Sequence, residues 1–155
     1  MESNIKIFQA TINELNLVAP LFNAYRVFYG QQSDISHAYE FLKNRILNSD
    51  SIIILATDNE KSLGFVQLYP SYSSISMDKI LILNDLFVAE DSRNRGIGRK
   101  LMDAAEFFFK KNAFAYLSLE TSTKNLRASR LYESCGYTKE TGVIHYKLKN
   151  PNHIC

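Results

Sequence analysis

The spacing of apolar residues changes several times along the chain, and each change predicts a different element. Residues 3–10 alternate between polar and apolar side chains, as a strand does. Over residues 13–29 the apolar side chains recur at helical spacing, and Pro20 can kink the helix that they predict. After Gly30, the same spacing predicts a second helix over residues 33–47.

The middle of the chain predicts strands. Residues 51–58 form a continuous β-branched run that ends in a polar turn, which is typical of a strand buried on both faces. Residues 63–72 are expected to pair with this run as a hairpin, and residues 79–88 follow as a third strand. Together these three segments predict an antiparallel meander.

Helical and extended segments alternate in the last third of the chain, which predicts a mixed α/β sheet. Gly136 is expected to end a helix, because glycine readily adopts the left-handed backbone found there. The elements expected in this part are a helix over residues 97–112, a strand over 113–120, a helix over 125–135 and a final strand over 143–148, before a tail at 150–155.

Length and composition limit the chain to one globular domain, residues 1–155. Its 155 residues fit a single domain, and 46% hydrophobic residues, with ten Phe and nine Tyr, supply one core. The net charge of +2 is too small for a nucleic-acid partner. Cys135 and Cys155 lack metal-ligand spacing, so we expect neither a metal site nor a disulfide scaffold.

The sequence carries no recognisable targeting segment. Its first four residues lack a basic region followed by an apolar run. No stretch approaches the roughly 18 apolar residues of a membrane span. We therefore expect a cytoplasmic protein that does not act at a membrane.

Positive charge concentrates where the strand at 79–88 gives way to a helix. Residues 93–111 hold six cations against two carboxylates, a local charge of +4 that leaves −2 for the remainder. Gly96 and Gly98 stand at the start of this helix, where unpaired backbone N–H groups and the helix dipole bind anions. The segment lacks the Gly-Lys-Ser/Thr ending of a Walker A loop, and Leu101 stands where a dinucleotide fingerprint needs a small residue. It therefore predicts a site for one small phosphate-bearing ligand.

Two motifs carry a resemblance to a known superfamily. Arg93-x-x-Gly96-x-Gly98 resembles the pyrophosphate loop of the GCN5-related N-acetyltransferase (GNAT) superfamily. Residues 125–137 are similar to its Asn-x-x-Ala-x-x-Leu-Tyr-x-x-x-Gly-Phe/Tyr segment, and residues 82–88 look like the small-amine, polyamine, histone and D-amino-acid acetylating branches. The resemblance implies the GNAT fold, an α/β (α+β) fold whose mixed, mostly antiparallel sheet has helices on both faces and a splay between the fourth and fifth strands.

The same resemblance implies how acetyl-CoA is held. The main chain of residues 86–88 would pair with the pantetheine arm like an extra strand, because the splay frees backbone groups there. Asn125 would bond the same arm, the N–H groups of residues 94–99 would hold the pyrophosphate, and a basic side chain of residues 124–130 would meet the 3′-phosphate. The implied cofactor-binding residues are Leu86, Phe87, Val88, Arg93, Asn94, Arg95, Gly96, Ile97, Gly98, Arg99 and Asn125.

Tyr132, inside the second motif, is the expected catalytic acid. A phenol with a pKa of about 10 stays protonated at pH 7, and it can protonate a leaving thiolate whose own pKa is about 8.5. Outside such a motif, a tyrosine on an apolar helical face is more often a core residue, so the assignment depends on the resemblance.

Several groups compete for the role of general base. A primary amine with a pKa of about 10 must lose a proton before it attacks. Members of the family often use a Glu near the middle of the strand that corresponds to residues 79–88. Here the matching face carries Asn84, which cannot act as a base, and period-two alternation turns Asp85 to the other face unless a bulge turns it inward. Asp85, Glu120 and a water chain are the alternatives.

The expected function is acetyl-CoA-dependent transfer of an acetyl group to a primary amine, by direct attack in a ternary complex without a metal. Small amines, polyamines and amino acids are the favoured acceptors, and Tyr25, Tyr29 and Asn84 are the expected acceptor-binding residues, because aromatic faces can receive a cationic amine. The alternatives are a noncatalytic CoA-binding module, to which Asn84 points, and a protein lysine or N-terminal acetyltransferase. The resemblance also implies a homodimer.

Overall fold

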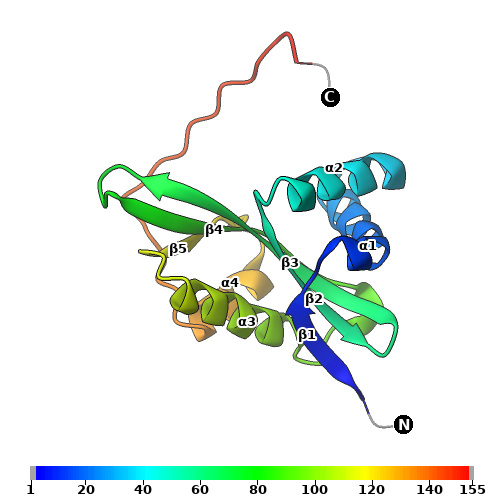
Figure 1. The fold of residues 1–155 in the computed structure, drawn as a ribbon. Coiled ribbons are helices and arrows are strands. Elements are labelled where there is room, and N and C mark those ends of the chain that lie inside the picture. The colour runs from blue at the N-terminus through cyan, green and yellow to red at the C-terminus, as the bar shows by residue number, and fades with distance from the viewer. Residues whose placement is uncertain (1–2, 154–155) are drawn as a thin grey trace.

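A computed structural model describes residues 3–153 as a mixed sheet with helices on both faces (Figure 1). The strands pair in chain order, antiparallel from the first to the fourth and parallel between the fourth and fifth. The expected α/β class and the meander are therefore confirmed. The strands are β1 (Ile5–Gln9), β2 (Ile52–Asp58), β3 (Lys61–Ser73), β4 (Asp78–Val88) and β5 (Leu117–Leu119), and the helices are α1 (Leu15–Phe28), α2 (Ile35–Leu47), α3 (Ile97–Lys111) and α4 (Leu126–Ser134).

Side-chain caps set where two of the helices begin. The Asp34 carboxylate accepts a hydrogen bond from the N–H of His37 and starts α2, and the Asn125 side chain accepts one from Ala128 and starts α4. Pro20 lies inside α1, which continues to Phe28. The loss of one backbone donor at Pro20 is tolerated, because α1 buries a wide apolar face against the sheet.

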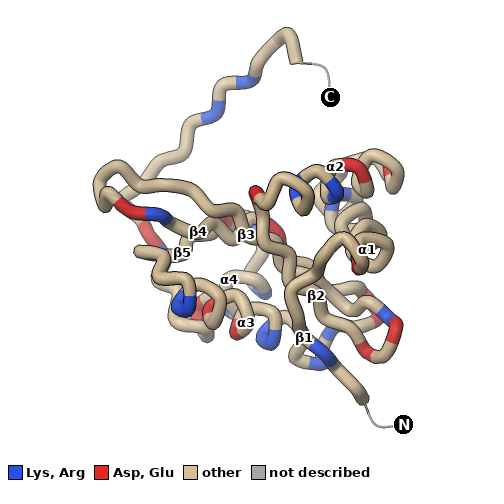
Figure 2. Tube along the Cα trace, in the orientation of Figure 1, with Lys and Arg blue, Asp and Glu red and all other residues tan. Residues whose placement is uncertain are grey.

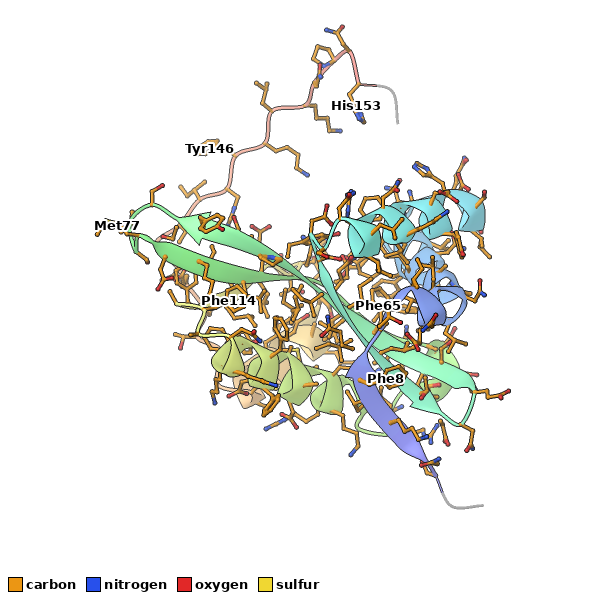
Figure 3. All side chains as sticks on the ribbon, in the orientation of Figure 1. Phe8, Phe65, Met77, Phe114, Tyr146 and His153 are labelled. Carbon is orange, nitrogen blue, oxygen red and sulfur yellow. The ribbon has the colours of Figure 1, made fainter. Side chains whose placement is uncertain are left out.

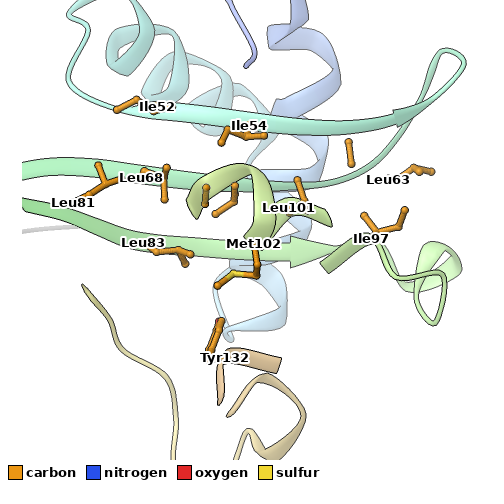
Figure 4. Close-up of a cluster of buried hydrophobic side chains, with 13 residues drawn as sticks. Ile52, Ile54, Leu63, Leu68, Leu81, Leu83, Ile97, Leu101, Met102 and Tyr132 are labelled. Atoms are coloured by element: carbon orange, nitrogen blue, oxygen red, sulfur yellow. The ribbon is translucent and has the colours of Figure 1, made fainter. Parts of the chain in front are cut away.

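The sheet separates two apolar clusters. On one face α3 and Tyr132 of α4 pack against side chains of β2, β3 and β4, as Figure 4 shows. On the other face α1 and α2 pack against Ile53, Leu55 and Phe65. Burial of these two faces holds the helices against the sheet, since each helix presents one apolar stripe.

The parallel pair β4–β5 is short. Residues 81–83 pair with residues 117–119, whereas residues 84–88 continue beside β3 alone. The backbone edge of β4 beyond Leu83 therefore has no strand partner among the described residues. This confirms the expected splay, and it leaves backbone groups available at one end of β4.

A β-bulge in β4 reverses the alternation of its side chains. Gln67 lies opposite Asp85 and Leu68 lies opposite Leu83, so Asn84 is an extra residue without a partner across the ladder. Leu83 faces α3, while Asp85 faces the side of α1. The bulge that the sequence left open is therefore present, and it gives Asp85 the face opposite to the one that simple alternation from Leu83 would give.

The expected final strand is absent from the structure. Residues 143–148 have no regular secondary structure and lie on an extended tail, on which Tyr146 stands clear of the sheet (Figure 3). A strand needs a neighbouring strand for its backbone groups, and residues 143–148 pair with no strand of the described sheet. Nδ1 of His145 lies 3.2 Å from Oε1 of Glu120, just after β5. The fifth strand is also shorter than the expected 113–120. Cys155 lies outside the described residues.

None of the helices within residues 3–153 is both long enough and apolar enough to cross a bilayer.

We predict that Gly64→Ala destabilises the protein. A Cβ at Gly64 would lie 2.7 Å from the carbonyl oxygen of Phe87 and 3.2 Å from Cα of Val88, so β3 and β4 would have to separate. The free energy of unfolding, measured in urea, should fall by about 1 to 3 kcal/mol. Gly142→Ala is the control, since nothing lies within 4 Å of its added Cβ, and it should change that free energy by less than about 0.5 kcal/mol. Equal effects of the two variants would contradict the prediction.

Candidate functional site

The centre of the candidate site is a buried carboxylate. Asp85 is only 4% exposed, and Oδ2 of its carboxylate accepts a hydrogen bond of 2.5 Å from Nε2 of Gln67. The hydroxyl of Tyr25 donates to the carbonyl oxygen of Asn84 at 3.4 Å, and it lies close enough to the same carboxylate to lower its pKa. The bulge at Asn84 thus brings β3, β4 and α1 together around one acidic group.

Burial changes the acid–base properties of this cluster. It raises the pKa of Asp85, and the hydrogen bonds from Gln67 and Tyr25 oppose that effect only in part. Burial, followed by the negative charge of Asp85, also raises the pKa of Tyr25. Asp85 is therefore a stronger base than an exposed aspartate, and Tyr25 remains a neutral phenol beside it.

Aromatic rings lead from Asp85 to the surface. The rings of Tyr25 and Tyr29 lie 4.9 Å apart, and those of Tyr29 and Phe28 lie 5.3 Å apart. The guanidinium of Arg93 lies 5.8 Å from the ring of Phe87 and 5.9 Å from that of Phe28. We call the rings of Tyr25, Tyr29, Phe28 and Phe87 the aromatic wall. Because Phe28 and Tyr29 are more than half exposed, one end of this wall lies in solvent and the other lies at the buried carboxylate.

Tyr132 approaches the same region from the opposite face of the sheet. Its side chain is 9% exposed and lies beside Met102 and Leu83 (Figure 4). Burial, and then the charge of Tyr29, raises the pKa of Tyr132 to about 12. Tyr132 of α4 and Tyr29 at the end of α1 interact electrostatically, although the two helices cover different faces of the sheet.

The loop before α3 presents a row of free donors. Asn94 and Gly96 adopt left-handed backbone, with φ of 62° and 73°, and Gly96 begins α3 without a side-chain cap. In the described structure, none of the backbone N–H groups of residues 94–99 donates to another backbone group, and the first such helical bond runs from Lys100 to Gly96. This arrangement suits an anion, as the two glycines predict.

Three of the basic side chains of this region have acidic partners. Arg95 pairs with Asp58 at 2.9 Å and lowers the pKa of that carboxyl. Arg99 pairs with Asp103 at 3.1 Å, and Lys110 pairs with Glu106. Along α3 two acidic residues stand between a basic pair at each end, and Figure 2 shows both charges on this helix. The local excess of positive charge in the sequence is partly neutralised in the fold, while the backbone N–H groups of residues 94–99 have no backbone acceptor in the described structure.

A hydrogen bond connects the two sequence motifs. Nη2 of Arg127 donates to Oδ1 of Asn94 at 3.0 Å, which ties α4 to the loop before α3. The helices also pack closely, since a Cβ at Gly98 would lie 3.3 Å from Cδ2 of Leu131. The side-chain oxygen of Asn125 accepts a hydrogen bond from the N–H of Ala128, and this cap holds the side chain at the start of α4.

The structure brings most of the predicted site residues together. Tyr25 interacts with Asp85 and with the ring of Tyr29, whereas the side chain of Asn84 is exposed at the bulge. Tyr132 belongs to the apolar cluster on the other face of the sheet. Glu120, the alternative base, is exposed and paired with His145. The sequence did not predict a role for Gln67. It is a polar residue inside the apolar run of β3, and such an interruption can indicate a buried polar group with a specific role.

No metal site is apparent in the described part of the chain. Within residues 3–153, no three His, Cys, Asp or Glu side chains are grouped so that they could hold a metal ion.

Comparisons with known proteins agree with this geometry. Residues 18–137 match the acetyltransferase (GNAT) family. The chain is 45% identical to a Bacillus subtilis protein named as the uncharacterized N-acetyltransferase YhfO, over 95% of this chain and 99% of that one. It is 36% identical to a probable acetyltransferase of Haemophilus influenzae, over 67% and 72% of the two chains.

Solved structures share the fold. A crystal structure of a probable acetyltransferase has a TM-score of 0.88 at 37% identity, and covers 96% of this chain and 99% of its own. An aminoglycoside acetyltransferase from an uncultured soil metagenomic sample has a TM-score of 0.82 at 20% identity, covering 94% and 96% of the two chains, a similarity of fold alone.

We predict that Asp85→Asn stabilises the protein at neutral pH. Asparagine has no charge to desolvate, and its amide can also donate to Oε1 of Gln67, which has no partner within the described structure. The free energy of unfolding in urea should rise by roughly 1 kcal/mol or more at pH 7.

The gain should depend on pH in a definite direction. Because the pKa of Asp85 is higher in the folded state than its ordinary 3.8, its destabilising effect is complete above the folded pKa and disappears as the pH falls toward 3.8. The gain of Asp85→Asn should therefore be smaller at pH 4 than at pH 7. Asp78→Asn, an exposed position on the same strand, is the control. A loss of stability in Asp85→Asn at pH 7 would contradict this account of the buried charge.

Proposed function

The chain belongs to the acetyltransferase (GNAT) family, and on that premise we propose that it moves an acetyl group from acetyl-CoA to a small primary amine by direct attack. The observation that carries the proposal is the buried carboxylate of Asp85, which is bonded to Gln67 and lies near Tyr25 on the part of β4 that has no β5 partner in the described structure. A candidate base and an aromatic wall thereby lie beside a free strand edge, and Tyr132 lies on the other face of the sheet.

The chain's backbone fits acetyl-CoA at two places. Residues 86–88 offer a strand edge without a partner in the described structure, to which an extended pantetheine arm can add. The N–H groups of residues 94–99 suit a pyrophosphate, and Asn125 lies at the start of the neighbouring helix α4. When bound, acetyl-CoA supplies an acetyl group activated as a thioester.

Asp85 is the proposed general base. It accepts a proton from the acceptor's ammonium group, and the free amine then attacks the acetyl carbon. The raised pKa of this buried carboxyl suits the task, because a base whose pKa lies closer to the working pH accepts a proton more readily. Glu120 is a weaker candidate, since its side chain is 77% exposed and is paired with His145.

Tyr132 is the proposed general acid. As the new C–N bond forms and the C–S bond breaks, its hydroxyl gives a proton to the leaving sulfur, and the proton that the new amide nitrogen loses restores the phenol. A pKa of about 12 keeps the hydroxyl protonated across the physiological range. Its burial also excludes water, which would otherwise compete for the same proton.

The aromatic wall is the proposed acceptor pocket. An ammonium group attracted to the negative faces of Tyr25 and Tyr29 would approach Asp85 from solvent. The alternative of a noncatalytic CoA-binding module depended on the lack of a carboxylate at Asn84. That motivation is weakened, because the bulge puts the carboxylate of Asp85 beside the same site.

The proposed activity is tested by mixing the protein with acetyl-CoA and a panel of small amines, polyamines, amino acids and basic peptides. Free thiol should appear with at least one small amine and should be absent without an acceptor. Binding of acetyl-CoA by calorimetry without thiol release from any acceptor would instead support the noncatalytic module. Absence of binding would overturn the proposal as a whole.

Tyr132→Phe is expected to lower turnover by about 10² to 10⁴, the usual contribution of a general acid. The affinity for acetyl-CoA should stay nearly unchanged, because the phenyl ring keeps the packing of α4. Tyr137→Phe is the matched control, since its ring lies only 6.1 Å from that of Tyr132, and its turnover should match the wild type. If Tyr132→Phe retains full turnover, Tyr132 has no role as the acid.

A further inference from the structure

Gln67 is a polar residue in one of the most deeply buried parts of the sheet. It is 0% exposed, and its neighbours along β3, Val66 and Leu68, are equally buried and apolar. A buried amide destabilises a fold unless its donors and acceptor are satisfied. Its presence at this position therefore needs an explanation beyond packing.

The side chain of Gln67 is aimed at Asp85 by the backbone itself. The two residues are partners in the β3–β4 ladder, at the last register position before the bulge. Nε2 of Gln67 donates to Oδ2 of Asp85 at 2.5 Å. Because both residues are anchored in paired strands, the donor is fixed relative to the carboxylate.

The other end of the same amide is unsatisfied. Oε1 of Gln67 is buried and accepts no hydrogen bond within the described structure. An apolar side chain, such as that of Phe65 or Leu68 on the same strand, would leave no such orphan. Stability alone thus disfavours glutamine here, whereas the bond from Nε2 to Asp85 favours it.

Few of the groups around Asp85 can stabilise its negative charge. Tyr25 of α1 interacts with Asp85 directly, and Tyr69 of β3 is close enough for the charge of Asp85 to raise its pKa. Tyr29 and Tyr132 act on Tyr25 and have no separate effect on Asp85. The charge of Arg45 of α2 acts on the pKa of Tyr69, but Arg45 is not among the groups that shift the pKa of Asp85. Among the described residues, hydrogen bonds from Gln67 and Tyr25, and no cation, stabilise the ionised carboxylate.

We propose that Gln67 is a positioning residue that holds the Asp85 carboxylate ionised and directed toward Tyr25 and the acceptor pocket. This inference rests on the proposed function. Gln67 occupies one carboxylate oxygen from the strand side, which leaves the remaining lone pairs to face α1, where the acceptor's proton would arrive. The amide itself takes no proton and touches no substrate.

The test replaces the amide by a side chain of the same length that has no N–H group, in Gln67→Met. The acid limb of the pH profile of kcat/KM should move to higher pH, because the carboxylate loses a donor that stabilises its charge. At pH 6 the value of kcat/KM should fall about tenfold. The dissociation constant for acetyl-CoA should not change. Thr57→Val, which alters another buried polar residue of the sheet, is the control and should leave the acid limb in place.

A direct titration separates this inference from the proposed function. The ¹³C signal of the Asp85 carboxyl, followed by NMR without substrate, should titrate at higher pH in Gln67→Met than in the wild type. If Gln67→Met does not fold, Gln67→Asn withdraws the amide by one methylene and should move the titration in the same direction. An unchanged titration in a folded variant overturns the positioning role. A shifted titration in a protein that acetylates no amine overturns the proposed function alone.

Discussion

The extra residue at Asn84 in β4 is the constraint on which the candidate site depends. In a strand, the face that a side chain occupies follows its position in the pairing, so one unpaired residue reverses every face after it. Regular pairing would put Asp85 on the same side as Leu83, against the apolar cluster of α3. With the bulge, Asp85 faces Tyr25, while Leu86 and Val88 complete the apolar face.

The buried groups that suit this site to acid–base chemistry also lower the stability of the fold. A charge is buried without a cation beside it, and the Gln67 amide that supports it leaves its own carbonyl unsatisfied. Both features destabilise the fold. The extensive apolar packing on the two faces of the sheet compensates for that loss of stability. Such a concentration of unfavourable groups at one place, next to an open strand edge, is typical of a functional site and rare in a structural core.

The proposed anion site in the loop before α3 illustrates a second division of roles, between side chains and backbone. The arginines at 95 and 99 are engaged with Asp58 and Asp103, so they organise the loop and the start of α3. The left-handed residues Asn94 and Gly96 then turn a run of N–H groups away from protein acceptors. Main-chain donors in a fixed loop lose little entropy on binding a phosphate, whereas long basic side chains would have to be ordered first.

The sequence by itself determined the class of fold, the order of the elements and the loop before α3, because those depend on local spacing, on caps such as Asn125 and on the two glycines. Tyr132, Tyr25 and Tyr29, the proposed site tyrosines, were also accessible from motifs and helical position. Tertiary structure alone decided the face of Asp85, the partnership with Gln67 and the absence of a strand over residues 143–148. Each of these depends on which backbone lies alongside, and the pattern of a single segment does not contain its pairing partner.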